Sequence, residues 1–200
     1  MTSHPAEPQG PFLLGMTYYW MGNYGAARPW FEKARELELD NVALYDVLGY
    51  SLFLLGDLAG ARREYEAYRA LRQEEPKAHY GVGLVELDEA HLPDAERCFA
   101  RAIELFDALE TRDPRQAAAR TAERAECYAR LAEVHFARAD YAAAKTELER
   151  ATALCPANIS AFHTLGLVYR RLGDEARAAE ALAHYENARQ ALVQAQGTPR

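Results

Sequence analysis

The sequence has few of the residues that mark several large protein classes. It contains three cysteines, Cys98, Cys127 and Cys155, without CxxC spacing, which excludes a disulfide framework and predicts no zinc site. Its apolar runs are short and broken by glycine, proline or charge, so no segment is predicted to insert into a membrane. Residues 1–10 hold no lysine or arginine and no apolar core, so we expect no secretory signal. These absences predict a cytoplasmic protein with reduced thiols.

Positive charge is also scarce. The chain has 23 Lys and Arg residues against 30 Asp and Glu residues, a formal net charge of −7. Binding to nucleic acid requires a positive stripe that releases counterions from phosphates, and no segment supplies one. We therefore expect no nucleic-acid partner. The preference for arginine over lysine, with many alanines, is typical of a GC-rich genome. A bacterial source is a separate expectation.

Residues that carry chemistry form no recognisable catalytic set. The glycines fall at turns and helix contacts and not in a phosphate-binding loop. The six histidines are scattered, and His79 and His135 fall at positions expected to be packed. No histidine can be assigned to activate Cys127 or Cys155, so these thiols are expected to be at least half-buried. The sequence therefore predicts a protein that is not an enzyme and uses no metal or other cofactor.

What the sequence does contain is a repeat of 34 residues. A large apolar residue followed by a small one recurs along the chain, and an alanine follows each small residue after 12 positions, with a large apolar residue four positions later. Between the two halves lies a turn typical of a helix stop followed by a helix N-cap. Each unit is therefore predicted to be helix, turn, helix. The recurring pairs are Leu14-Gly15, Leu48-Gly49, Val82-Gly83, Leu131-Ala132 and Leu165-Gly166, and the turns are Gly22-Asn23, Gly56-Asp57, Ala139-Asp140 and Gly173-Asp174.

This pattern resembles the tetratricopeptide repeat family. The resemblance implies an all-α fold, a right-handed α-solenoid of five helix-turn-helix repeats with the first helices lining its concave side. Small residues of the first helix would face alanines of the second helix. The implied repeats are 8–41, 42–75, 76–109, 125–158 and 159–192, in a single solenoid over 11–193 with flexible ends at 1–10 and 194–200.

Two features depart from a regular array. Residues 110–124 are extra; Asp113 and Pro114 read as an N-cap and a first helical position, so one unbroken helix is expected from Pro114 to about Ala139. This helical insertion would extend a hairpin, either as a charged, solvated extension or as a docking spike. Glu86 occupies a position that is aromatic or apolar in other repeats, which predicts a distortion or a one-residue slip there.

The groove implied by the resemblance is apolar at its N-terminal end and charged at its C-terminal end. An apolar surface this continuous indicates binding, unless tight curvature or the chain's own N-terminus already covers it. The predicted groove residues are Phe12, Met16, Tyr19, Trp20, Tyr50, Phe53, Leu54, Tyr80, Leu84, Leu87, Arg170 and Arg171.

The function that follows is a protein-protein interaction scaffold or adaptor that binds an apolar or aromatic peptide or helix in the groove. The alternative is a bacterial secretion or assembly chaperone that shields a hydrophobic segment of its client. The partner is a protein or peptide in both cases, and a homo-oligomer is also compatible with the sequence.

Overall fold

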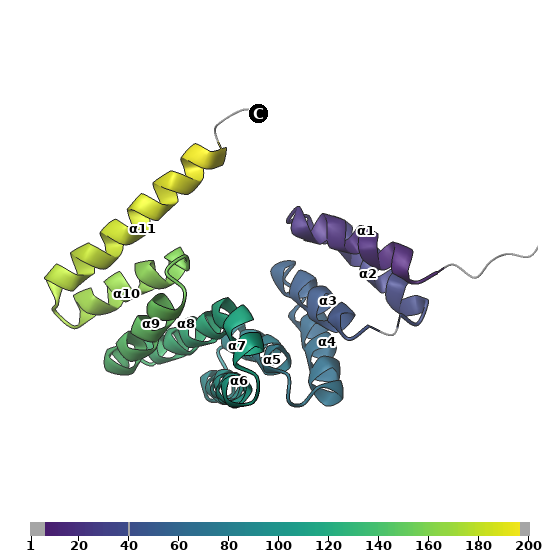
Figure 1. The fold of residues 1–200 in the computed structure, drawn as a ribbon, viewed down its shortest axis with the longest axis horizontal. Coiled ribbons are helices and arrows are strands. Elements are labelled where there is room, and N and C mark those ends of the chain that lie inside the picture. The colour runs from purple at the N-terminus through teal and green to yellow at the C-terminus, as the bar shows by residue number, and fades with distance from the viewer. Residues whose placement is uncertain (1–6, 40, 197–200) are drawn as a thin grey trace, which may run out of the picture. The chain divides into compact units, whose positions relative to one another are not determined.

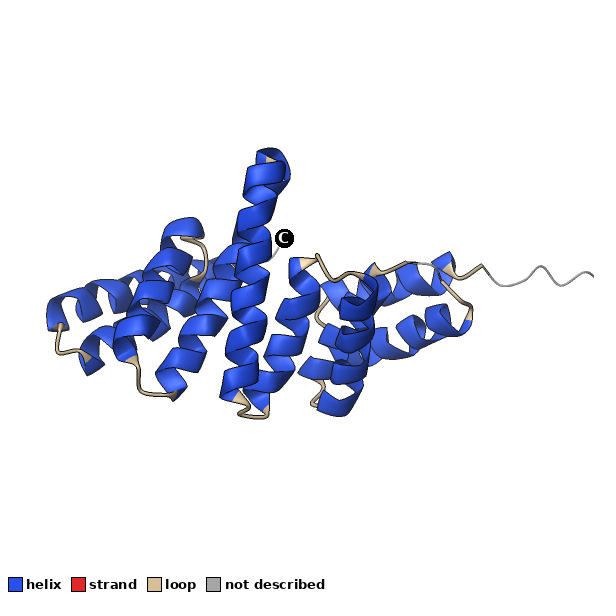
Figure 2. Cartoon of the chain, turned by 90° about the horizontal axis from the view of Figure 1, so that it is seen from below, coloured by secondary structure: helices blue, strands red, loops and turns tan. Residues whose placement is uncertain are grey.

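The computed structural model describes residues 7–39 and 41–196. Within these ranges every regular element is an α-helix and no strand occurs (Figure 2), so the predicted all-α class is confirmed. The chain divides into two compact units, Met1–Glu89 and Ala90–Arg200. Residues 1–6 and 197–200 of the ends predicted to be flexible lie outside the described residues, whereas Gln9 and Gly10 belong to a helix.

The first unit contains two helical hairpins and one further helix. Helices α1 and α2 pair, as do α3 and α4, and α5 packs against both α3 and α4 (Figure 1). The hairpins correspond to the predicted repeats 8–41 and 42–75, and α5 is the first helix of the predicted repeat 76–109. The helices are α1 (Gln9–Trp20), α2 (Tyr24–Glu36), α3 (Ala43–Leu54), α4 (Leu58–Leu71) and α5 (Pro76–Asp88).

The second unit contains two hairpins preceded by a long helix and the insertion. Helices α8 and α9 pair, as do α10 and α11, while α6 packs along α8 (Figure 1). The hairpins correspond to the predicted repeats 125–158 and 159–192. The helices are α6 (Leu92–Arg112), α7 (Pro114–Ala119), α8 (Thr121–Ala137), α9 (Tyr141–Leu154), α10 (Ile159–Arg171) and α11 (Glu175–Gln196).

The four predicted hairpin turns are confirmed. Each has one residue with positive φ, where glycine is favoured because it lacks a Cβ atom: Gly22 at +71°, Gly56 at +77°, Ala139 at +60° and Gly173 at +79°. The next residue, Asn23, Asp57, Asp140 or Asp174, accepts a hydrogen bond from the backbone N–H three positions on, at 2.9–3.1 Å. The turn sequence thus ends one helix and caps the next.

Close packing inside each hairpin rests on glycine facing a large side chain. A Cβ atom on Gly15 would lie 2.5 Å from Phe31, one on Gly49 would lie 2.9 Å from Tyr65, and one on Gly166 would lie 2.6 Å from Leu182. Each pair is 16 residues apart. The nearest side chain is thus the large apolar residue and not the expected alanine, although the backbone oxygen of Ala178 also lies 3.4 Å from the Cβ position at Gly166.

The ring of Tyr65 is enclosed from two sides. Besides Gly49 on α3 it meets Gly81 on α5, where an added Cβ atom would lie 2.2 Å from Cδ1 of the ring. Tyr65 is 1% exposed, and burial raises the pKa of its phenol well above its usual range. One aromatic ring therefore joins a hairpin to the first helix of the next repeat.

The insertion is helical, but the prediction of one unbroken helix from Pro114 is wrong. Asp113 caps α7 by accepting a hydrogen bond from the N–H of Gln116 at 3.1 Å, as expected. The helix then breaks at Arg120, where φ is −111°. The Arg120 guanidinium lies over the Phe106 ring, 5.1 Å from its centroid, and its Nε donates to Glu123 at 2.6 Å.

This break lets α8 run along α6. Arg124 of α8 pairs with Asp107 of α6 and with Glu110 at 2.6 Å, and its guanidinium lies over the Tyr128 ring. The charged face predicted for the insertion is thus in part an internal ion-pair network that holds the extended hairpin together.

A candidate protein-binding surface

The predicted groove residues of the first unit lie on α1, α3 and α5 at different depths. Trp20 is 76% exposed and Leu54 is 43% exposed, whereas Leu84 is only 4% exposed and offers a partner almost no surface. The others are half-buried: Phe12, Met16, Tyr19, Tyr50, Phe53, Tyr80 and Leu87. The accessible part of the predicted set is therefore at the ends of α1 and α3, with a half-buried layer behind it.

Three tyrosines form the centre of this layer, and we call Tyr19, Tyr24 and Tyr50 the aromatic cluster. The ring centroids are 5.5 Å apart for Tyr19 and Tyr24 and 6.1 Å apart for Tyr50 and each of the other two. Such tilted and edge-on geometries favour aromatic pairs. The cluster links α3 to both helices of the preceding hairpin.

Sequence reasoning missed Tyr24, because it begins the second helix and the groove was assigned to first helices only. A signal was present: an aromatic residue stands on each side of the turn, five positions apart. The same spacing recurs in the second unit, where the Phe136 and Tyr141 centroids are 5.5 Å apart.

Charge enters this surface through Asp46 on α3. Its carboxylate lies 3.6 Å from Nζ of Lys77 on α5. Burial, and next the charge of Asp46, raises the pKa of the Tyr19 phenol, so Tyr19 is neutral and a hydrogen-bond donor at physiological pH. The layer is therefore mainly apolar, with one internal ion pair.

Four large apolar side chains stand at the ends of α1 and α3, and we call Trp20, Met21, Leu54 and Leu55 the helix-end ridge. Trp20 and Leu54 are the last residues of their helices, and Met21 and Leu55 are the C-caps. Met21 is 71% exposed and Leu55 is 45% exposed. Equivalent positions of neighbouring repeats therefore expose apolar side chains together.

Family models for the tetratricopeptide repeat match residues 13–37 and 125–158. The second match has the bounds predicted for the fourth repeat. The chain is a tetratricopeptide-repeat protein. No curated protein matches the sequence.

Solved structures share the fold of this repeat protein. The thermophilic protein TTC0263 of Thermus thermophilus is 18% identical with a TM-score of 0.66, covering 93% of this chain and 99% of that one. MamA is 19% identical with a TM-score of 0.64, covering 90% and 97%. A chain of the Cut9–Hcn1 hetero-tetramer is 18% identical with a TM-score of 0.77, covering 90% of this chain and 33% of that one.

The predicted groove residues of the second unit are charged. Arg170 and Arg171 are exposed, and the Arg171 guanidinium lies 6.0 Å from the centroid of the Tyr141 ring. At the other end of α10, its N-cap Asn158 donates a side-chain hydrogen bond to Glu126 at 3.0 Å, and Glu126 pairs with Arg130 at 2.9 Å. This surface therefore combines charged groups with one exposed apolar side chain at the end of α10, Leu172, which is 44% exposed.

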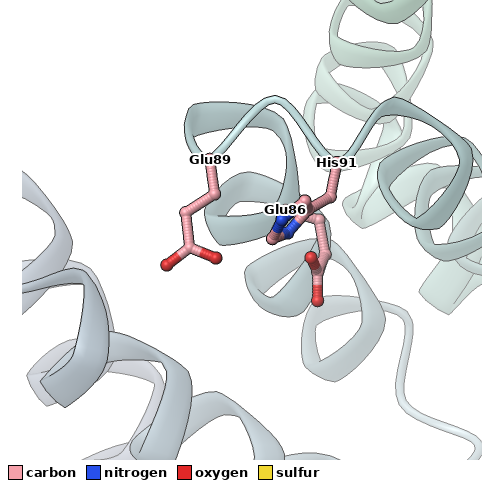
Figure 3. A group of neighbouring side chains, drawn as sticks. All are labelled: Glu86, Glu89 and His91. Carbon is pink, nitrogen blue, oxygen red and sulfur yellow. The ribbon is translucent and has the colours of Figure 1, made fainter.

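The departure at Glu86 is explained by an ion pair. Figure 3 shows Glu86 and Glu89 near the end of α5 and His91 beyond it. Arg62 of α4 reaches both carboxylates, with Nη1 2.5 Å from Glu86 and Nη2 2.6 Å from Glu89. Helix α5 therefore tolerates a buried glutamate without a break, and both carboxylates serve to neutralise the guanidinium.

The three thiols, His79 and His135 are at least half-buried, as expected. Cys127 is 1% exposed and burial raises the pKa of its thiol, which disfavours the nucleophilic thiolate. Cys98 and Cys155 are half-buried thiols that form no disulfide. His79 and His135 are half-buried, and Nε2 of His79 lies 2.8 Å from the carbonyl oxygen of Gln73. Among the described residues, no helix is long and apolar enough to span a bilayer.

Proposed function

We propose that this repeat protein is a non-catalytic scaffold whose first unit binds an apolar or aromatic segment of a partner protein. Tetratricopeptide repeats support protein binding in general. A fold neighbour lies in a hetero-tetramer of two named proteins, which is in keeping with a role in assembly. The reduced cysteines fit a cytoplasmic setting.

The exposure of the helix-end ridge carries this proposal. Isolated exposed apolar residues are ordinary, but Trp20, Met21, Leu54 and Leu55 are grouped by the repeat itself. Burying one such side chain in an interface contributes about 1.5–3 kcal/mol. Tryptophan is also the residue type most enriched among side chains that dominate binding.

Site-specific crosslinking tests the proposal. A photo-crosslinking amino acid is placed at Trp20 or Leu54 in cells that make the protein, and at Leu71 as a control. Leu71 is the last residue of α4 and is 54% exposed, so it matches Leu54 in residue type, exposure and place in its helix.

We expect a discrete adduct with another protein from Trp20 and Leu54 and none from Leu71. The same adducts from all three positions would show non-specific contact and contradict the proposal. An adduct between two copies of the chain would identify a homo-oligomer in place of a scaffold surface.

The chaperone function is a second candidate because the exposed apolar surface extends over α1, where Leu13 is 62% and Leu14 is 45% exposed. A chaperone would keep its crosslinked partner soluble. Aggregation of that partner, measured by light scattering with and without the chain, distinguishes the two functions.

A further inference from the structure

A row of three equivalent positions crosses the first unit. Trp20, Leu54 and Asp88 are each the last residue of a first helix, α1, α3 and α5. Helix α1 packs against α3, and α3 packs against α5. The row therefore consists of an apolar residue on α1, an apolar residue on α3 and an acidic residue on α5, and each of these helices packs against the next.

The acidic member is an uncompensated charge. Asp88 is exposed, and no ion pair or hydrogen bond to its side chain occurs among residues 7–39 and 41–196. Its neighbour Glu89 is different, because Arg62 pairs with it at 2.6 Å. Asp88 also stands at the C-terminal end of α5, where the helix dipole is negative and cations are favoured. The helix end and the carboxylate thus add to one negative potential.

We propose that the occupant of this row is a basic amphipathic helix of a partner protein. It presents two apolar residues seven positions apart to Trp20 and Leu54, and a lysine or arginine seven positions further to Asp88. This inference rests on the proposed function, because it names the partner for the same surface. The charge complementarity places the basic end of that helix at α5.

The spacing of the row favours a helix over an extended peptide. Packed helices lie about 8–10 Å apart, and seven residues of an α-helix rise about 10.5 Å. Residues seven apart also share a face, with a drift of about 20° per heptad. An extended chain covers the same distance in about three residues, which places the second side chain on the opposite face.

A display selection with the full chain tests the inference without assuming a partner. Random peptides of about 20 residues, long enough for five helical turns, are selected against the immobilised protein. We expect enriched peptides with an apolar, an apolar and a basic residue at successive seven-residue intervals, in either direction along the peptide. Enriched peptides with alternating apolar residues, or helical ones without the basic residue, would overturn the inference.

Fluorescence anisotropy then measures the affinity of one enriched peptide for the wild type and for variants of the row. The comparison tests whether the peptide binds at these positions. Trp20→Ser is expected to weaken binding about tenfold or more, and Leu71→Ser to leave it unchanged. Asp88→Asn is expected to weaken binding about threefold to tenfold at low salt and to reduce its salt dependence. The control Glu36→Gln, at the exposed last residue of α2, should have no effect.

A charge swap separates failure of the inference from failure of the proposed function. Asp88→Lys should reverse the preference, so that a peptide with glutamate in place of the basic residue binds more tightly than its lysine counterpart. Binding that depends on Trp20 but ignores this swap would overturn the basic-helix inference and leave the proposed surface intact. Binding indifferent to Trp20→Ser would overturn both.

Discussion

The two units are built from the same repeat, and their interiors are alike while their exposed positions differ. Gly49 and Gly166 are equivalent, and each faces the large residue 16 positions later. By contrast, the position of Phe53 in the first unit is Arg170 in the second, and that of Trp20 is Ala137. The positions that pack hairpins are constrained by volume, and the exposed positions vary with the surface that each unit presents.

The largest effect on stability is expected from Gly49→Leu, which is compared with Gly166→Leu at the equivalent position of the second unit. Tyr65 is enclosed by Gly49 and Gly81 and cannot move away, whereas Leu182 is half-buried and can change rotamer. We expect Gly49→Leu to destabilise the protein by about 3 kcal/mol or more and Gly166→Leu by less. Thermal melting measures both, with Gly25→Leu, whose Cβ would meet its nearest side-chain atom at 4.0 Å, as the control. Equal losses at the three positions would show that the enclosure of Tyr65 does not matter.

Removing an aromatic ring should affect the first unit more than the second. Tyr50 contacts at least the rings of Tyr19 and Tyr24, whereas Phe136 has one ring partner, Tyr141, among the described residues. We expect Tyr50→Ala to cost about 2 kcal/mol in denaturant unfolding and Phe136→Ala about 1 kcal/mol.

The matched control for this comparison is Tyr50→Phe, which keeps the ring and should retain most of the stability. An unchanged midpoint for Tyr50→Ala would mean that the aromatic cluster does not join the two hairpins.

Alkaline pH should weaken the second unit first. The pKa of the Cys127 thiol is raised by burial, so above pH 9 the unfolded chain loses this proton while the folded chain keeps it. Stability is then fully present below that pH and falls as pH rises, by about 1.4 kcal/mol per pH unit for this group. The Tyr65 phenol acts with the same sign, starting near pH 10.

Melting curves between pH 8 and pH 11 measure this effect, and Cys127→Ala should remove the earlier part of the decline. A variant whose stability declines from pH 9 as steeply as that of the wild type would contradict the assignment.

The smallest expected effect is a gain in stability from the turn between α8 and α9 in the second unit. Ala139 holds a φ of +60°, where its Cβ atom is strained, while the first unit has glycine at both equivalent positions. Ala139→Gly should stabilise the protein by up to about 1 kcal/mol, because relief of strain exceeds the added entropy of the unfolded chain. Gly56→Ala should do the reverse, and a shift of both melting temperatures in the same direction would refute this explanation.

The repeats were predictable because their signals are local and recur. The turn at Gly56 and Asp57 and the cap at Asp113 require particular residue types at fixed spacing, and the structure has both. The break at Arg120 was not predictable, because it depends on the Phe106 ring of another helix and the alanine-rich segment contains no helix breaker. The pairing of Glu86 with Arg62 is likewise a contact across 24 residues.

The candidate surface was predictable only in outline. The repeat register placed Trp20 and Leu54 on the first helices, but it could not show that Leu84 is buried or that Tyr24 completes the aromatic cluster. The exposure of a side chain depends on how neighbouring helices pack, and the spacing of residues along the sequence does not specify that packing.

The enclosure of Tyr65 has a consequence for motion. Glycines of two helices, Gly49 and Gly81, both lie against Cδ1 and Cε1 of this ring, so the ring cannot turn about its Cβ–Cγ bond unless the hairpin and α5 move apart. Its two edges therefore exchange environments only as fast as the helices separate, which is slower than for a half-buried tyrosine such as Tyr18. In NMR spectra the two sides of the Tyr65 ring should give separate resonances, and the temperature at which they merge would report how often neighbouring repeats come apart.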